Sequence, residues 1–161
     1  MNGGLLIVHA LLVINEREMA PHWDFLVNAV CDGITNSEDS NAGRMACGLV
    51  SDLSNYFEKD IQRSANSFLQ RLNHVLDSND FETETKIYAL IAVGDLCLAI
   101  SEGFLQFLNP TMRTLMSAAE LTLKVTNFDS SEMTSRLRDA IIDAFISILH
   151  GMQPVCSAGS D

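Results

Sequence analysis

Residues 87–100 read IYALIAVGDLCLAI, an almost continuous apolar run that contains one acid, Asp95. An apolar stretch of this length is typical of a helix that packs against neighbours on more than one side. Residues 59–78 instead carry apolar side chains at spacings of three and four, which indicates a helix with one buried face. The whole sequence has only three prolines and nine glycines, and its other segments keep this helical spacing. The predicted fold class is therefore all-α.

The apolar run is also part of a repeat. The segment GLVSDL at 48–53 matches IAVGDL at 91–96, a shift of 43 residues, and Phe25-Leu26 matches Phe68-Leu69 at the same shift. A weaker copy, IIDAF, follows at 141–145. A period slightly above 40 residues with two helices per unit is typical of HEAT and armadillo repeats, whose hairpins stack into an α-α superhelix. The alternative is a single compact bundle of helices of similar length.

Three polar clusters predict the longer connections between helices: NSEDSN at 36–41, DSNDFE at 77–82 and NFDSSE at 127–132. Each cluster offers Ser, Asp or Asn as an N-cap for the helix that follows. Tight turns separate the other helices, so the pattern indicates helical hairpins in series. The tail at 153–161 has no periodicity and is expected to be disordered.

Charge and composition narrow the classes of partner. The 161 residues include 21 acids and 10 bases, which gives a net charge of −11, and 47% of them are hydrophobic. This apolar content excludes a disordered chain. The negative surface disfavours nucleic acid and anionic membranes as partners and favours a basic protein or peptide. The apolar segment 3–14 lacks the features of a signal peptide and is too short to span a bilayer, so it is interpreted as a buried helix.

Chemistry-bearing residues do not form a catalytic or metal-binding pattern. The cysteines have no CxxC pair and no histidine at ligand spacing, which argues against zinc and against a disulfide framework and fits a reducing compartment. The histidines have no nucleophile in a recognisable motif, and no nucleotide-binding motif is present. We therefore expect no enzyme activity, metal or cofactor. The residues concerned are Cys31, Cys47, Cys97, Cys156, His9, His22, His74 and His150.

Three runs carry a resemblance to a known family: ACGLVSDLS at 46–54, AVGDLCLAI at 92–100 followed by Gly103-Phe104, and LRDAIIDAF at 137–145 with Gly151-Met152. They resemble the middle HEAT repeats of the importin-β (karyopherin-β) family of nuclear import receptors. The resemblance covers most of residues 4–152, and no single motif in it is diagnostic.

The resemblance implies the phase of the repeats. Residues 1–152 would form about three and a half hairpins cut from a longer receptor, beginning with a second (B) helix at 3–15. Three pairs of a first (A) and a second (B) helix would follow, at about 19–56, 59–102 and 104–150. The A helices would lie near 19–34, 59–77 and 104–126, and the B helices near 42–56, 84–102 and 133–150.

Acids on the B helices are the candidates for cargo binding. Asp52, Asp95 and Asp143 occupy matching places on three successive B helices, so stacking would align them. The resemblance implies that this face is concave and holds basic nuclear localisation signals or the basic segment of the importin-α adaptor. The alternative is a structural role, in which each Asp caps a helix or pairs with Arg136 or Arg138. Further acids that we expect to be solvated on this face are Glu84, Glu102 and Asp139.

The resemblance also implies that shallow pockets between A helices on the convex face bind the Phe-Gly repeats of nucleoporins. By position, the candidates are Phe68, Phe104, Leu108 and Met112. Most apolar residues of the A helices belong to the core under the alternative interpretation, and a pocket needs only two or three that are partly exposed. Weak pockets become useful when the ligand carries many copies of its motif.

These features predict a transport-receptor segment found in the cytoplasm, the nucleus and the nuclear pore. Ran-GTP would bind mostly through repeats outside this segment. Dimerisation is expected through the ends of the chain, because the apolar helix at 5–13 would lack its partner. The alternatives are a HEAT-repeat scaffold of another complex, such as a phosphatase regulatory subunit or a trafficking adaptor, and a compact helical enzyme.

Overall fold

The computed structural model describes residues 20–124 and 132–158. Within these ranges the chain forms six α-helices and two short 3-10 helices, and it contains no strand. The elements are η1 (Ala20–His22), α3 (Trp23–Ile34), α4 (Ser40–Tyr56), α5 (Glu58–Asp77), α6 (Thr83–Ile100), η2 (Ser101–Phe104), α7 (Leu105–Lys124) and α8 (Glu132–Ala158). The predicted all-α class is confirmed. The predicted helix at 3–15 and the dimerisation through helix 5–13 fall outside the described residues.

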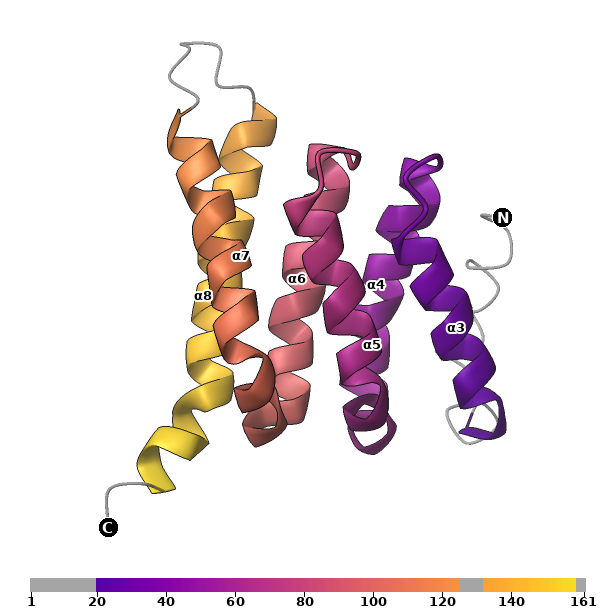
Figure 1. The fold of residues 1–161 in the computed structure, drawn as a ribbon. Coiled ribbons are helices and arrows are strands. Elements are labelled where there is room, and N and C mark those ends of the chain that lie inside the picture. The colour runs from indigo at the N-terminus through magenta and orange to yellow at the C-terminus, as the bar shows by residue number, and fades with distance from the viewer. Residues whose placement is uncertain (1–19, 125–131, 159–161) are drawn as a thin grey trace.

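The helices form three hairpins, α3–α4, α5–α6 and α7–α8, which stack side by side (Figure 1). The A helices α3, α5 and α7 make one layer, and the B helices α4, α6 and α8 make the second layer behind it. We call the contact of α3–α4 with α5–α6 the first interface, and the contact of α5–α6 with α7–α8 the second interface. This arrangement is a helical-hairpin solenoid, as the repeat spacing predicts.

The connections alternate in length. A single residue, Phe57, joins α4 to α5, and η2 joins α6 to α7, whereas the connections within the hairpins are longer. The α3–α4 connection ends in an N-cap, because the Asp39 carboxylate accepts a hydrogen bond from the backbone N–H of Ala42 at 3.0 Å. No side-chain cap is found at the start of α6, where Glu82 occupies the N-cap position.

Helix α6 lies at the centre of the fold and packs against α4, α5 and α8. Its buried apolar residues face these three helices, while Tyr88, Ile91 and Leu98 remain partly exposed on the outer side of the B layer. Among the described residues, the stretch 83–123, which begins with α6, is apolar and long enough to cross a membrane by composition alone. More than half of its most apolar window is buried inside the protein, as expected for a core helix.

Helix α8 continues to Ala158. The expectation of a disordered tail from residue 153 is therefore wrong for residues 153–158. Gly151 packs against the backbone of Cys97, and Met152 is buried in the core, so packing anchors the end of a helix that has no apolar periodicity of its own. Tertiary contacts rather than local pattern set this boundary.

Candidate functional site

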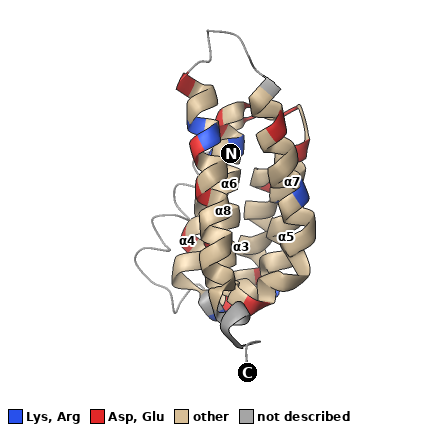
Figure 2. Ribbon diagram, turned by 90° about the vertical axis from the view of Figure 1, so that its left-hand side faces the viewer, with Lys and Arg blue, Asp and Glu red and all other residues tan. Residues whose placement is uncertain are grey.

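The acids expected to line the B layer lie on three different helices. Asp52 on α4 and Asp95 on α6 are half-buried, and Asp143 on α8 is exposed. Asp95 lies between the exposed residues Ile91 and Leu98, four and three positions away, which places it on the outer face of α6. Viewed along the stack, acidic segments lie on the edge formed by the B helices and also on the A-helix side and at the helix ends (Figure 2). The arrangement can attract a basic ligand at the B-layer surface.

Glu84 forms ionic contacts with the two neighbouring B helices. Its carboxylate pairs with Arg44 of α4, and its other oxygen lies 3.8 Å from Nη1 of Arg136 on α8. Arg44 also donates a hydrogen bond to the side chain of Asn41. Glu84 is therefore only partly solvated, at 29% exposure, because it pairs with Arg44, and its role in cargo binding stays a prediction. Glu84 links the three B helices near their N-terminal ends.

The remaining two acids of the predicted set, Glu102 in η2 and Asp139 on α8, are exposed. Arg138, one of the arginines considered as a partner for the aspartates, donates a hydrogen bond to the backbone carbonyl of Thr122 on α7 at 2.6 Å. It therefore ties the two helices of the third hairpin together. Of these predicted acids, Asp139, Asp143 and Glu102 are exposed, and Asp52 and Asp95 are half-buried.

The apolar residues expected on the A layer divide into two groups. Phe68 and Phe104 are 0% exposed and belong to the hydrophobic core, so their expected place on an accessible surface is wrong. Leu108 and Met112 are half-buried on α7 and pack against that core. The exposed apolar residues of α7 are instead Leu105, Met116, Leu121 and Leu123.

A cavity of about 320 Å³ opens at the second interface, where the α5–α6 connection meets the ends of α7 and α8. Four helices and one connection contribute to its wall, which includes Leu76, Phe81, Lys86, Leu90, Leu121 and Leu137. Burial lowers the pKa of Lys86 from its ordinary value, and the negative charge of Asp77 opposes that shift. Sequence pattern alone gave no signal for this cavity, because its wall combines residues from separate segments of the chain.

Metal and thiol chemistry find little support in this part of the chain. Among the described residues, no group of three His, Cys, Asp or Glu side chains is placed to hold a metal ion. Burial raises the pKa of Cys47 and of Cys97 to about 12, so both thiols stay protonated at neutral pH. Burial also raises the pKa of Cys31. These cysteines are core residues.

Stacked two-helix units with one surface on each layer define a helical-repeat scaffold, a class whose extended surfaces bind partners. A family model described as "Importin subunit beta-1-like, TPR repeats" matches residues 3–158. The chain therefore belongs to the importin subunit beta-1-like family. The shift of 43 residues is longer than the 34 residues of a TPR unit and fits the HEAT range.

Two curated relatives support the same family. The chain is 29% identical over 123 residues to importin subunit beta-1 of Arabidopsis thaliana. The aligned segment covers 75% of this chain and 14% of that protein. It is 24% identical over 150 residues to importin subunit beta-1 of Schizosaccharomyces pombe, which covers 92% of this chain and 17% of that protein. The chain thus spans less than a fifth of the length of these relatives.

Proposed function

We propose that this chain is a binding segment of a nuclear transport receptor, without enzyme activity. The observation that supports this proposal is the family match over residues 3–158 together with the hairpin stack. In the proposal, the B layer attracts a basic segment of cargo or of the importin-α adaptor, and the cavity between the second and third hairpins binds Phe-Gly segments of nucleoporins. Ran-GTP binding and shuttling between the cytoplasm and the nucleus belong to the proposal for the whole receptor.

The B-layer proposal rests on four acids for which no arginine pair like that of Glu84 is found among the described residues: Asp95, Asp139, Asp143 and Glu102. Several acids acting together raise the association rate of a basic ligand, and salt weakens this effect over a Debye length of about 8 Å. Individual exposed pairs contribute little, so the effect of removing one acid is expected to be small.

The test measures binding of a basic importin-β-binding peptide of importin-α to the 161-residue chain at low and high salt. We expect the triple variant Asp95→Asn, Asp139→Asn and Asp143→Asn to weaken binding and to flatten its salt dependence. A control with the same change in charge replaces exposed acids that lie elsewhere: Asp24→Asn, Glu38→Gln and Asp80→Asn. Equal losses in the two triple variants would show that only net charge matters and would overturn the B-layer site.

The Phe-Gly proposal rests on the cavity at the second interface. Just over half of its lining residues are apolar, it opens between neighbouring hairpins, and Leu121 at its edge is 57% exposed. A single such pocket gives weak binding, and a ligand with many copies of its motif compensates through multivalency. Leu108 and Met112 do not line this cavity and pack against the core instead.

The test measures binding of a Phe-Gly repeat peptide to the chain and to Leu121→Glu. We expect the variant to lose binding, because a carboxylate at the edge of the cavity disfavours an aromatic ligand. Phe25→Glu is the matched control, because Phe25 is also exposed and lies on α3, away from the cavity. Unchanged binding in Leu121→Glu would overturn this site.

The alternative scaffold functions, in a phosphatase regulatory subunit or a trafficking adaptor, lose their basis because the family match supplies a more specific relationship.

A further inference from the structure

The turn between α6 and α7 holds a residue in an unfavourable backbone conformation. Ser101 has φ 42° and ψ −113°, and it is the only non-glycine residue with a positive φ among those the structure describes. A side chain in this region clashes with the backbone, which glycine avoids because it has no Cβ. The hydroxyl of Ser101 donates a long hydrogen bond, 3.4 Å, to the carbonyl of Leu98. This turn is the covalent link between the second and third hairpins.

The second interface is tight close to this turn. A Cβ added to Gly94 of α6 would lie 3.0 Å from the Cβ of Ser147 on α8. A Cβ added to Gly151 of α8 would lie 2.9 Å from the carbonyl oxygen of Cys97. Phe104 of the turn is fully buried, and the turn packs against α8. The helices therefore pack closely at this end, and the contact leaves little room for separation.

The opposite end of the same interface is open. The cavity of about 320 Å³ is lined by residues of the first half of α6 and of the start of α8, far from the Ser101 turn. Helix α6 has 18 residues, a length of about 27 Å, so each degree of rotation about the turn moves the far end by about 0.5 Å. A small rotation of the third hairpin changes the volume of the cavity while the packing at the turn stays in place.

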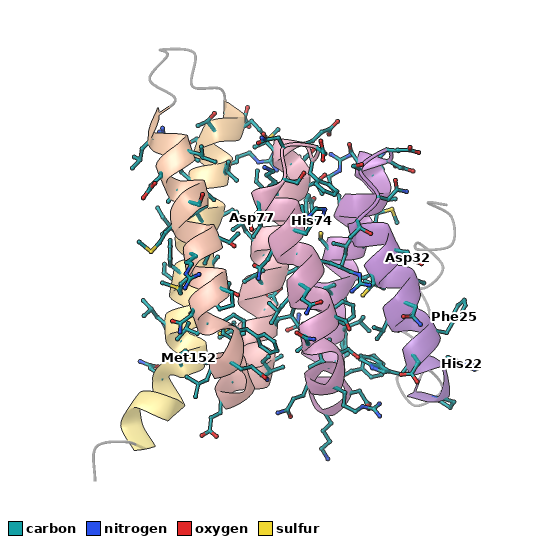
Figure 3. All side chains as sticks on the ribbon, in the orientation of Figure 1. His22, Phe25, Asp32, His74, Asp77 and Met152 are labelled. Atoms are coloured by element: carbon teal, nitrogen blue, oxygen red, sulfur yellow. The ribbon has the colours of Figure 1, made fainter. Side chains whose placement is uncertain are left out.

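Polar contacts at the open end are long. The hydroxyl of Thr114 on α7 donates to the Asp77 carboxylate of α5 at 3.3 Å, and Arg136 lies 3.8 Å from Glu84. Figure 3 shows Asp77 on the side of α5 that faces α7. The first interface differs, because it is held at both ends. Trp23 donates to Ser64 at 2.9 Å at one end, and Arg44 pairs with Glu84 at the other.

We propose that the Ser101–Phe104 turn is a pivot about which the third hairpin swings, and that an apolar side chain bound in the cavity fixes the angle of the swing. The identity of that ligand, a Phe-Gly segment, rests on the proposed function. The pivot itself rests on the strained turn, the tight contacts beside it and the cavity at the far end. In this proposal, the strained backbone of Ser101 disfavours the arrangement of the third hairpin in which the cavity is open. Relieving the strain therefore favours the open cavity.

The experiment measures distances between spin labels by double electron–electron resonance in the 161-residue chain. The labels are attached to p-acetylphenylalanine, which leaves the native cysteines unchanged. One pair, at Gln70 and Glu120, spans the second interface, and a reference pair, at Asp32 and Gln70, spans the first. The labels leave the contacts between helices intact, because Asp32, Gln70 and Glu120 are exposed on the A helices.

We expect a broader distance distribution for the label pair 70–120, across the second interface, than for the label pair 32–70, across the first. Ser101→Gly removes the clash and narrows the 70–120 distribution, whereas Ser101→Ala keeps the Cβ and leaves it broad. A cavity-filling variant, Ala118→Leu, narrows 70–120 without a ligand. Equal widths at the two interfaces, or equal responses to Ser101→Gly and Ser101→Ala, would overturn the pivot.

Adding a Phe-Gly repeat peptide tests the coupling. We expect the peptide to narrow 70–120 alone and to bind Ser101→Gly about fivefold or more tightly than the wild type, because the two effects are thermodynamically linked. Binding of equal strength to both proteins, with no change in 70–120, would overturn the coupling. If no variant binds the peptide, the Phe-Gly function fails, and the distances measured without peptide still decide the pivot.

Discussion

The first and second interfaces join hairpins in the same register, and yet they are closed in different ways. At the first interface, the buried Trp23–Ser64 hydrogen bond holds one end and the Arg44–Glu84 pair holds the other. At the second, Gly151 packs on the backbone of Cys97 and Gly94 on the side chain of Ser147 at one end, and a cavity opens at the other. A repeat therefore fixes which faces meet, while individual residues decide where an interface is rigid. The two interfaces can be separated experimentally.

The largest effect is expected from breaking the first interface at Trp23. Its indole is 2% exposed, packs 5.3 Å from the ring of Phe57, and donates to Ser64. Trp23→Ala leaves a cavity and an unpaired hydroxyl, and we expect it to lower the free energy of unfolding by about 3–5 kcal/mol. Urea unfolding followed by circular dichroism measures this loss. Thr114→Val, which removes the long contact at the second interface, serves as the comparison and should cost under about 1 kcal/mol.

The second effect compares one buried thiol in each interface. The pKa of Cys47 and that of Cys97 are about 12 in the folded protein, above the ordinary value of 9.0. Above pH 9 the unfolded chain loses these protons while the folded chain keeps them, so stability falls as the pH rises from about 9 towards 12. From pH 9 to 10 the expected loss is about 1 kcal/mol per thiol.

Thermal or urea unfolding between pH 8 and 10 measures this slope. Cys47→Ala and Cys97→Ala should each remove the contribution of one thiol to this slope, although each variant also lowers the free energy of unfolding at every pH. A slope that is unchanged in both variants would mean that other groups control the alkaline loss of stability.

The third effect uses two glycines of the B helices. Gly151→Ala places a Cβ against the backbone of Cys97, which cannot move aside as a side chain can, and we expect a loss of about 1–3 kcal/mol. Gly48→Ala is the matched control, because no atom lies within 4 Å of its added Cβ, and it should gain about 0.5–1 kcal/mol. Losses of equal size in both variants would contradict the close contact at the second interface.

The smallest effect is expected at Glu84, which reaches both interfaces through Arg44 and Arg136. Because these side chains are partly exposed, Glu84→Gln should cost only about 0.2–1 kcal/mol, and the loss should shrink at high salt. Asp60→Asn is the control, since the Asp60–Arg63 pair at 2.7 Å lies within one helix and joins no hairpins. A salt-independent loss would indicate a packing role for Glu84 instead of an ionic one.

Much of the fold was predictable from local pattern, because a helix requires only apolar residues at spacings of three and four. Register was harder to interpret, as Phe25 and Phe68 illustrate. They occupy the same repeat position, and yet Phe25 is 77% exposed and Phe68 is 0% exposed. Phe68 is part of the hydrophobic core, whereas Phe25 points away from the other described helices (Figure 3). Burial depends on the neighbouring hairpin, which the pattern of one helix does not describe.

The candidate surfaces were predicted less well for the same reason. The acidic character of the B helices was readable as composition, but the pairing of Glu84 joins residues that lie 40 positions or more apart in the sequence. The same holds for the cavity, whose wall combines residues between Leu76 and Leu137. The exposed apolar stripe on α8, made by Ile142, Ile146 and Leu149, could be recognised as amphipathic, although its direction depends on where α6 lies.

The sequence by itself determined the helical hairpins, their period and the family, because these depend on spacing and composition along the chain. Only the tertiary structure decided which acids are neutralised, which phenylalanines are buried and which end of the second interface stays open. These properties arise from contacts between segments far apart in the chain, where a change of one side chain, such as a glycine in place of a larger residue, sets the distance between two helices.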